Sequence, residues 1–348
     1  MSAAEVRLPG IEPAGVTPWL VEHVDGLRAP VTFSLVSGGR SNLTYRVTDA
    51  AGVARALRRP PTGGVLSTAH DMGREWRFLV ALAPTAVPVA QPLAFCDDRD
   101  VADADFYVMG FVDGVVLADQ QAARRLSAPA RRRAGEAVVE VMAALHGVDP
   151  DEVGLGDVAR RDGYIERQLR RWKRQVHQSG APDLDTLDRV HNALAAHVPP
   201  QANGIAHGDC RPGNMAFDDD GEVLAVFDWE LATLGDPLAD LGWLIASWQQ
   251  PGDDVEATTA GPSLEPGFPT RDEMVDRYAR LSGRDVSNLP YYVAFSRWRS
   301  ACIGAGVRAR YLAGVMGDDG YAAEVRGQEG ARQGEAALDA VRELGLLR

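Results

Sequence analysis

The sequence has almost no lysine, few cysteines and no long apolar run. Lys173 is its single lysine among 36 basic residues, so arginine carries nearly all of the positive charge. The three cysteines lie far apart and form no CxxC pair, which argues against a disulfide framework or a cysteine-based zinc site. No apolar run approaches the roughly 18 residues of a membrane span. The opening residues lack a basic start followed by an apolar stretch, so we expect no secretory signal and a cytoplasmic location.

The overall charge of the chain is acidic. Its 348 residues carry a formal net charge of −13, which disfavours nucleic acid as a partner because phosphate binding needs a basic surface. The hydrophobic share of 45% and the charged share of 24% are typical of a soluble globular protein, and we expect no membrane partner. The length is sufficient for two lobes that each bury a core.

Strand patterns dominate the first third of the chain. A helical repeat also begins there at His70, and short strand-like segments begin at four positions, Val31, Asn42, Val53 and Phe106. This order predicts a small lobe with a sheet and one main helix.

Helical patterns dominate the chain after Gly114. Ser127 is a plausible N-cap for a long helix, and Thr270 and Glu273 have the spacing of a capping box. Helices are predicted in the segments SAPARRRAGEAVVEVMAALHGVD, GYIERQLRRWKRQVHQ, DTLDRVHNALAAH, PTRDEMVDRYARLSG, YYVAFSRWRSACIGAGVRARYLAG and EGARQGEAALDAVRELGLL. We therefore predict an α+β protein with an N-terminal lobe over residues 1–110 and a mainly helical C-terminal lobe over residues 111–348.

The segment HGDCRPGN, residues 207–214, contains a candidate catalytic pair. Asp209 and Asn214 have the spacing D-x-x-x-x-N, which allows one loop to present a carboxylate to a hydroxyl proton and an amide oxygen to a metal ion. A structural turn is the alternative, because Asp, Asn, Pro and Gly all favour turns.

A second carboxylate follows at a useful distance. The segments MAF and VLAVF can pair as a hairpin around Asp219, Asp220 and Gly221, and the return strand would bring Asp228 close to Asn214. Mg²⁺ prefers one or two carboxylates together with phosphate oxygens and water. The combined pattern therefore favours a phosphoryl-transfer site that holds Mg²⁺.

From about Leu35 to its C-terminal helices, the chain resembles the aminoglycoside phosphotransferase (phosphotransferase enzyme) family of kinase-like proteins. HGDCRPGN resembles the catalytic loop of that family, and FDWELATLGDPLADLGW resembles its metal-binding strand and the following helix. The resemblance implies a bilobal protein-kinase-like fold in which Asp209 is the base and Asn214 and Asp228 hold Mg²⁺. Asp240 resembles a buried residue that braces the catalytic loop, although a charge at a helix N-terminus explains it equally well.

The resemblance also implies that the first lobe binds ATP. Between two predicted strands lies a glycine-containing turn whose backbone N–H groups could approach phosphate; its residues are Ser37, Gly38, Gly39, Arg40, Ser41 and Asn42. A simple turn between strands is the alternative. Met109 to Val112, including Phe111, would form the hinge against adenine. Gly110 stands there where relatives often carry Glu, which removes a side-chain contact.

Arginine has to replace the lysine with which kinases usually hold the α- and β-phosphates, because this lobe contains no lysine. Strand alternation favours Arg58 over Arg55 or Arg59, with Glu75 as its partner on the helix. An exposed strand charge is the alternative interpretation of Arg58.

The acceptor is expected to be a small molecule. Asp228 and Asp240 are too close for the activation segment on which protein kinases bind a peptide. An aminoglycoside, which is a polycation, would need an acidic pocket. The loop from Gln249 to Pro269 contains four acidic residues, which solvation alone also explains: Asp253, Asp254, Glu256 and Glu265.

Three further segments resemble the branch of the family whose members include domains fused to acyl-CoA dehydrogenases: LRRPPTGGVLSTAHDMGREWRFL, YIERQLRRWKRQ and DWELATLGDPLADL. That branch implies phosphorylation of a hydroxyacyl-CoA. One face of the predicted helix carries four arginines that could bind CoA phosphates: Arg167, Arg170, Arg171 and Arg174. A face that is simply exposed to solvent is the alternative. A catalytically retired module that binds nucleotide or acyl-CoA is the rival interpretation, disfavoured because Asp209, Asn214 and Asp228 are all present.

Overall fold

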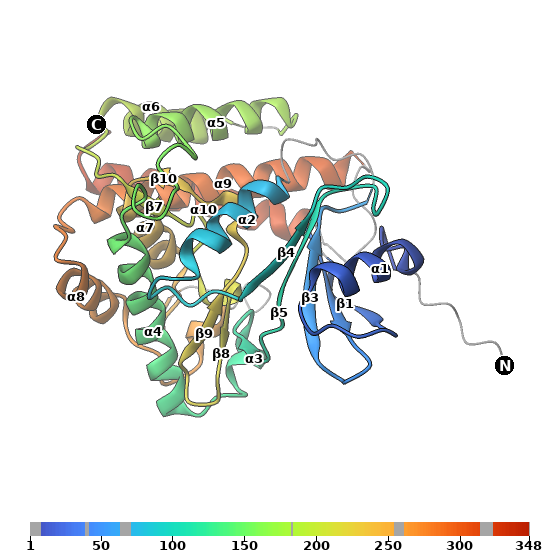
Figure 1. Ribbon diagram of the computed structural model, residues 1–348. Coiled ribbons are helices and arrows are strands. Elements are labelled where there is room, and N and C mark those ends of the chain that lie inside the picture. Colours follow the sequence, from blue (N-terminus) through green and yellow to red (C-terminus); the bar gives the residue numbers. More distant parts are fainter. Residues whose placement is uncertain are drawn as a thin grey trace.

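The computed structural model describes residues 8–38, 42–62, 71–181, 184–253, 261–313 and 323–347 of the chain. For residues 37–38 and 323–330 it describes the backbone alone. A small lobe built on a sheet lies beside a larger helical lobe (Figure 1). The architecture is α+β and kinase-like, as predicted. Among the described residues, no helix is both long and apolar enough to cross a membrane.

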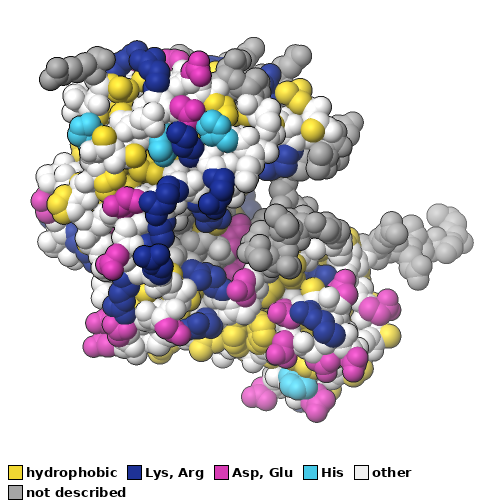
Figure 2. Space-filling model, turned by 90° about the horizontal axis from the view of Figure 1, so that it is seen from above, with side chains coloured by type: hydrophobic (Ala, Val, Ile, Leu, Met, Phe, Trp, Pro, Cys, Tyr) yellow, Lys and Arg dark blue, Asp and Glu magenta, His cyan; other side chains and the backbone are white. Residues whose placement is uncertain are grey.

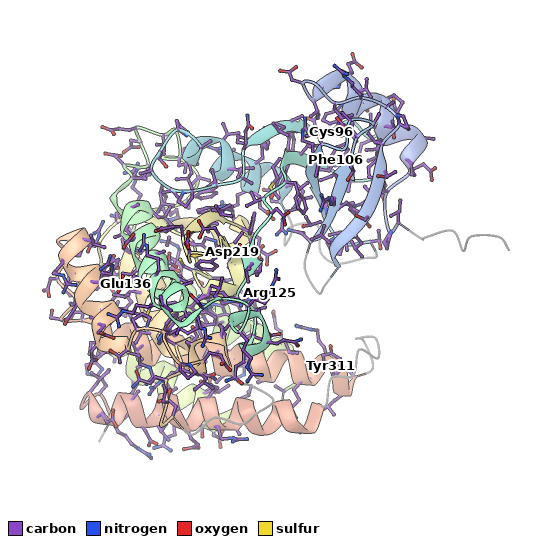
Figure 3. All side chains as sticks on the ribbon, turned by 90° about the horizontal axis from the view of Figure 1, so that it is seen from below. Cys96, Phe106, Arg125, Glu136, Asp219 and Tyr311 are labelled. Atoms are coloured by element: carbon purple, nitrogen blue, oxygen red, sulfur yellow. The ribbon has the colours of Figure 1, made fainter. Side chains whose placement is uncertain are left out.

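The small lobe contains a five-stranded antiparallel sheet with the order β1-β2-β3-β5-β4. The strands are β1 Thr32–Gly38, β2 Leu43–Thr48, β3 Ala54–Arg59, β4 Pro92–Cys96 and β5 Phe106–Gly110. Alternate residues of β2 are buried, as expected for a strand with one face on a core. Figure 3 shows Cys96 and Phe106, paired residues of β4 and β5, within this lobe and far from Tyr311 at the end of the long helix α9 (Leu289–Leu312).

A helix that the sequence did not predict, α1 (Pro13–His23), packs against this sheet. Its Val16 and Leu20 are fully buried in a cluster with Tyr45 and Val108 of the sheet. The helix carries prolines at positions 13 and 18 and has no sharply divided apolar face, so neither periodicity nor cap residues revealed it.

The main helix of the small lobe, α2 (Met72–Leu82), faces both lobes. Asp71 caps it by accepting a hydrogen bond from the backbone of Arg74. Its Met72 and Leu79 pack toward β3 and β5, whereas Phe78 belongs to the large core of the helical lobe. The predicted lobe boundary at residue 110 is also the last residue of β5.

The larger lobe is mainly helical. Its helices are α3 Gln120–Ala123, α4 Ala128–Gly147, α5 Tyr164–Gln178, α6 Asp185–Ala196, α7 Pro237–Ser247, α8 Arg271–Ser282, α9 Leu289–Leu312 and α10 Ala323–Glu343. Both predicted caps are confirmed: Ser127 accepts a hydrogen bond from the backbone of Ala130, and Thr270 and Glu273 form a complete capping box.

Short strands in this lobe position the loops that carry the candidate site. The predicted hairpin is present as β8 (Met215–Phe217) and β9 (Val223–Val226), and β6 (Val115–Val116) adds a third strand. A second pair joins β7 (Gly204–Ala206) to β10 (Thr233–Gly235). The short helices η1 (Pro212–Asn214) and η2 (Trp229–Leu231) stand next to these strands. The backbone N–H of Val226 donates to the carbonyl of Pro88 at 2.9 Å, which ties the hairpin to the segment between α2 and β4 of the small lobe.

Candidate active site

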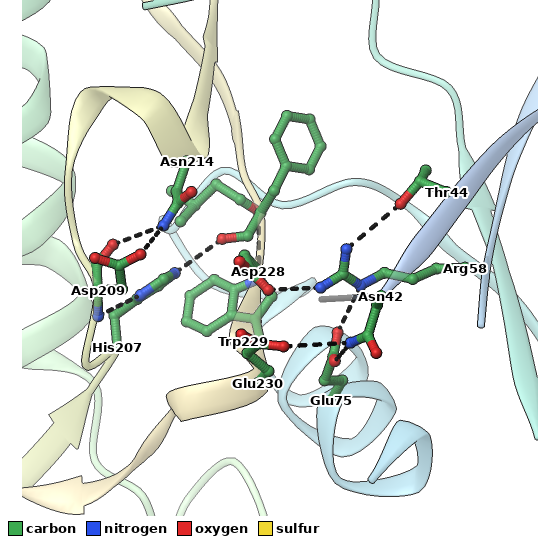
Figure 4. Close-up of polar contacts among 12 residues, drawn as sticks. Asn42, Thr44, Arg58, Glu75, His207, Asp209, Asn214, Asp228, Trp229 and Glu230 are labelled. Atoms are coloured by element: carbon green, nitrogen blue, oxygen red, sulfur yellow. Dashed lines mark hydrogen bonds and ion pairs between the residues drawn. The ribbon is translucent and has the colours of Figure 1, made fainter. Parts of the chain in front are cut away.

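Asp209 lies in the loop between β7 and η1, and its carboxylate is held through both oxygens. Figure 4 shows its contact with Asn214. Oδ1 accepts a hydrogen bond from Nε1 of Trp243 at 2.7 Å, and Oδ2 accepts one from Nδ2 of Asn214 at 2.7 Å. Nε of Arg211 lies 3.3 Å from both oxygens. The single Nε–H of Arg211 is shared between the two oxygens, so three donors supply three protons to about four lone-pair positions. One position therefore remains from which Asp209 can accept a substrate hydroxyl proton.

Asp240, at the start of α7, braces this loop from below. Its carboxylate accepts hydrogen bonds from the backbone N–H groups of His207 at 2.6 Å and Gly208 at 2.8 Å. His146 approaches the same carboxylate at 3.3 Å. Burial raises the pKa of Asp240, but its hydrogen bond with His146 and the other interactions outweigh burial and leave that pKa below its ordinary value. Of the two interpretations from sequence, these contacts favour the bracing role.

Three residues that the sequence analysis did not assign also fix the loop. Nε2 of His207 contacts the carbonyl of Phe227 at 2.9 Å, which joins the loop that carries Asp209 to the chain just before Asp228. Nη2 of Arg299, on α9, donates to the carbonyl of Gly208 at 2.8 Å. The Arg299 guanidinium also lies 4.4 Å from the ring centre of Trp243, the donor to Asp209. Because the partners are separated by up to 91 positions, no local pattern could have shown them.

Asn214 and Asp228 come together as predicted. The backbone N–H of Phe227 donates to the carbonyl of Asn214 at 2.8 Å, and Met215 pairs with Val226, so the two side chains stand at one end of the hairpin. Asp228 has a φ of 66°, a left-handed conformation that Asp tolerates better than most residues. Figure 4 shows it between Asn214 and Arg58.

The donor set at this point fits Mg²⁺. Nδ2 of Asn214 is already engaged by Asp209, so Oδ1 is the atom that can face a cation. The carboxylates of Glu75, Asp228 and Glu230 each place one oxygen within 4.8 Å of the others. Carboxylate and amide oxygens are the ligands that this hard cation prefers.

Arg58 is the arginine of β3 that reaches this centre. Its Nε donates to Oε2 of Glu75 at 2.9 Å, and its Nη2 donates to Oδ1 of Asp228 at 2.5 Å. Burial lowers its pKa, but Glu75 and other nearby groups more than offset this effect and raise the pKa above its ordinary value. Arg59 instead pairs with Asp103 at 2.8 Å, and Arg55 donates only weakly to the carbonyl of its neighbour at 3.4 Å.

Glu75 is almost fully buried, at 1% exposure, and lies at the centre of a polar network. It accepts hydrogen bonds from Nδ2 of Asn42 at 2.6 Å and from the hydroxyl of Tyr107 at 3.0 Å, in addition to Arg58. Burial is the largest effect on its pKa, which is raised. Oδ1 of Asn42 is buried and has no hydrogen-bond partner within the described parts of the chain, as expected where a ligand supplies the partner.

The predicted phosphate-covering turn is only partly described. Ser37 and Gly38 end β1 and Asn42 immediately precedes β2, whereas Gly39, Arg40 and Ser41 lie outside the described residues.

The predicted hinge lies beside an apolar surface between the lobes. Met109, Phe111 and Val112 belong to a cluster that also includes Ala56 and Phe227. The N–H of Gly110 donates to the carbonyl of Gln91 at 2.8 Å, so the backbone donors free for adenine would be further along the hinge.

The arginines of α5 differ in their surroundings. Arg167 donates to the carbonyls of Asp162 and Arg160, the latter at 2.7 Å, so it helps to hold the loop before the helix. Arg171 and Arg174 are exposed. Figure 2 looks down on the face that carries α5 and α6 and shows basic side chains gathered beside the hollow between the lobes.

The acidic loop after α7 is partly neutralised. Asp253 pairs with Arg271, whose Nη1 lies 3.1 Å from the carboxylate. Glu265 pairs with Arg124, whose Nη2 lies 2.8 Å from the carboxylate. Asp254 and Glu256 lie outside the described residues. The two described acids therefore offer little attraction to a cationic acceptor.

Comparison with known sequences shows a match over most of the chain. Residues 32–290 match the family model of the phosphotransferase enzyme family. Acyl-CoA dehydrogenase family member 11 of Gallus gallus is 35% identical over 293 residues, 80% of this chain and 36% of that protein. Acyl-CoA dehydrogenase family member 10 of Mus musculus is 33% identical over 288 residues, 79% of this chain and 26% of that protein. The chain therefore spans roughly a quarter to a third of the length of these two relatives.

Solved structures show the same fold. A Ralstonia eutropha protein, solved as a candidate aminoglycoside phosphotransferase, superposes with a TM-score of 0.80 at 31% identity and covers 95% of this chain and 98% of its own. Choline kinase from Cryptosporidium parvum superposes with a TM-score of 0.65 at 11% identity, covers 97% and 98% of the two chains, and supports the fold alone.

Proposed function

The chain belongs to the phosphotransferase enzyme family, and we propose that it transfers the γ-phosphoryl group of Mg·ATP to a hydroxyl group of a small molecule. The observation that carries this proposal is the arrangement of Asp209, Asn214 and Asp228. Asp209 is fixed through both oxygens with one lone-pair position left for the acceptor hydroxyl, and the two candidate metal ligands stand beside it at one end of a hairpin.

In the proposed reaction, the acceptor oxygen forms a bond to the γ-phosphorus, and the bond from that phosphorus to the β–γ bridging oxygen breaks, so that ADP leaves. Asp209 orients the acceptor hydroxyl and receives its proton. Asn214 and Asp228 would hold Mg²⁺, which when bound neutralises charge on the phosphate oxygens. Arg58 would contact the phosphates in place of a lysine, held in position by Glu75.

A small acceptor suits the segment between Asp228 and Asp240. This segment folds at once into η2, β10 and the first turn of α7, which leaves no peptide-binding platform. The relatives from chicken and mouse carry acyl-CoA dehydrogenase in their names, and this supports a hydroxyacyl-CoA as the acceptor.

The test is the release of ADP from Mg·ATP with a panel of acceptors: 3- and 4-hydroxyacyl-CoAs, choline, homoserine, sugars and an aminoglycoside. Asp209→Ala should lower turnover by about 10²- to 10⁴-fold while nucleotide binding persists. Asp219→Ala, in the exposed turn of the hairpin, is the matched control and should retain full turnover.

Two results would contradict this assignment. Unchanged turnover in Asp209→Ala would remove its role as the base. Unchanged affinity for Mg·ATP in Asp228→Ala, measured by calorimetry, would remove the metal assignment. Tight nucleotide binding without ADP release for any acceptor would instead favour the catalytically retired module.

A further inference from the structure

A cleft of about 550 Å³ opens beside the catalytic loop. Its walls come from the loop itself, from α7, from α9 and from α10. Arg211 and Trp243 line it, and these are the two residues that donate to the carboxylate of Asp209 together with Asn214. A molecule in this cleft would therefore lie against side chains in direct contact with the proposed base.

The charge of the cleft is opposite to that of the whole protein. Its lining has a single acidic residue, Asp253, and four arginines, Arg211, Arg271, Arg297 and Arg332, on a chain of net charge −13. Arg271 is paired with Asp253, and Arg211 is paired with Asp209, so the charges of these two arginines are balanced. Arg297, on α9, is partly buried and makes no hydrogen bond or ion pair with the residues that the structure describes. It attracts the carboxylate of Asp253, but that carboxylate is already paired with Arg271. A cation in such a wall gains from an anionic ligand, because charge-assisted contacts are stronger where water is partly excluded.

The cleft also contains a polar atom that lacks a partner. Ser296 lines it and is 1% exposed, yet its Oγ has no hydrogen-bond partner in the described ranges. Buried hydroxyl groups without a partner are uncommon, and a bound water or ion is one way in which they are satisfied. Adjacent residues on a helix do not face each other. Ser296 and Arg297 nevertheless both line this cleft, so one bound molecule could contact both.

We propose that the cleft binds an anionic group, phosphate or carboxylate, of the acceptor, and that Arg297 and Ser296 recognise it while Trp243 lies between this group and Asp209. This inference rests on the proposed function in one respect only, which is that the anionic group belongs to the phosphoryl acceptor. It assigns anion recognition to the cleft rather than to the exposed arginines of α5, of which Arg167 already holds the preceding loop. It also disfavours a polycationic acceptor.

Binding tests this inference without turnover. The intact protein is saturated with Mg²⁺ and a non-hydrolysable ATP analogue, and calorimetry measures the binding of three probes: coenzyme A, malate and an aminoglycoside. Binding of coenzyme A alone would identify phosphate as the recognised group, and binding of malate would identify carboxylate. Binding of neither anion, or tighter binding of the aminoglycoside, would overturn the proposal.

Substitutions locate the site. Arg297→Glu should weaken binding of the anionic probe at least about tenfold, the usual effect of losing a hydrogen bond to a charged group, whereas Arg297→Lys should keep most of it. Arg174→Glu, on the exposed face of α5, tests the rival site and should bind normally. Arg189→Glu, at an exposed position of α6, is the charge-matched control, and thermal midpoints confirm that each variant is folded. Loss of binding in Arg174→Glu but not in Arg297→Glu would place recognition on α5 and overturn the assignment. Anion binding without any turnover would contradict only the proposed function, and turnover of an acceptor without anion binding would contradict only this inference.

Discussion

The indole N–H of Trp243 donates to Oδ1 of Asp209 at 2.7 Å, and the ring of Trp243 lies 4.4 Å from the guanidinium of Arg299. Arg299 in turn donates to the carbonyl of Gly208, directly before Asp209. Helices α7 and α9 therefore control the orientation of the proposed base from outside its own loop. The relationship makes Trp243 a positioning residue, because it acts through Asp209.

Trp243→Phe should lower kcat by about 10- to 100-fold, since it removes one hydrogen bond to a charged group and leaves the ring in place. The KM for ATP should stay unchanged, because the nucleotide would lie on the other side of the loop. Steady-state kinetics with varied ATP measure both values.

Trp248→Phe is the control for that change. Trp248 lines the same cleft, but its indole N–H donates to the carbonyl of Pro269 at 2.9 Å and does not reach Asp209. An equal loss of kcat in both variants would show a general packing effect instead of positioning.

Arg58→Met should weaken ATP binding by at least about tenfold, because it removes a buried cation from the proposed phosphate site and leaves Glu75 and Asp228 without their partner. Arg58→Lys should restore part of the affinity. Calorimetry with Mg·ATP measures the effect, and Arg55→Met on the same strand should bind as the natural protein does. Equal affinities for the Arg58 and Arg55 variants would be incompatible with the assignment.

Asp240→Asn should destabilise the protein by about 2–3 kcal/mol at neutral pH, because one of its oxygens becomes an amide donor that faces backbone N–H groups. The pKa of Asp240 is lowered in the folded protein, so the ionised carboxylate contributes stability above its ordinary pKa of about 4. That contribution is lost as the pH falls below about 4 toward the lowered folded-state value.

Urea unfolding of Asp240→Asn and the natural protein at several pH values tests this prediction. The difference between them should be largest near pH 7 and should shrink below about pH 4. Asp100→Asn, at an exposed position, is the control. A difference that is constant with pH would show that the charge of Asp240 has no role.

Gly208→Ala should destabilise the catalytic loop by more than about 2 kcal/mol and remove most of the activity. Gly208 has a φ of +84°, and a Cβ there would lie 2.9 Å from both Cβ and the carbonyl oxygen of Leu231. Gly283→Ala is the matched control, because Gly283 also has a positive φ of +64° but faces open space. It should cost only about 1 kcal/mol. Thermal unfolding measures the stability of both variants. Equal decreases in the stability of Gly208→Ala and Gly283→Ala would mean that the contact with Leu231 is unimportant.

The sequence predicted well where neighbouring residues decide the structure. The hairpin around Asp219 and Gly221 follows from turn residues between two apolar segments, and the capping box at Thr270 follows from side chains that bond their own helix end. The approach of Asn214 to Asp228 is a consequence of that hairpin. Helix α1 was missed because it carries two prolines and no clear apolar stripe.

The sequence by itself thus determined the α+β architecture and the chemical groups of the catalytic loop, because strand alternation, helical periodicity, caps and turns act over a few residues. Only the tertiary structure decided which distant side chains complete the site. Trp243 reaches Asp209 across 34 positions, and Arg299 reaches Gly208 across 91. Arg297 lines the cleft from α9, the helix that also carries Arg299. These contacts depend on how α7 and α9 pack against the loop, and packing is set by the whole core rather than by any local pattern.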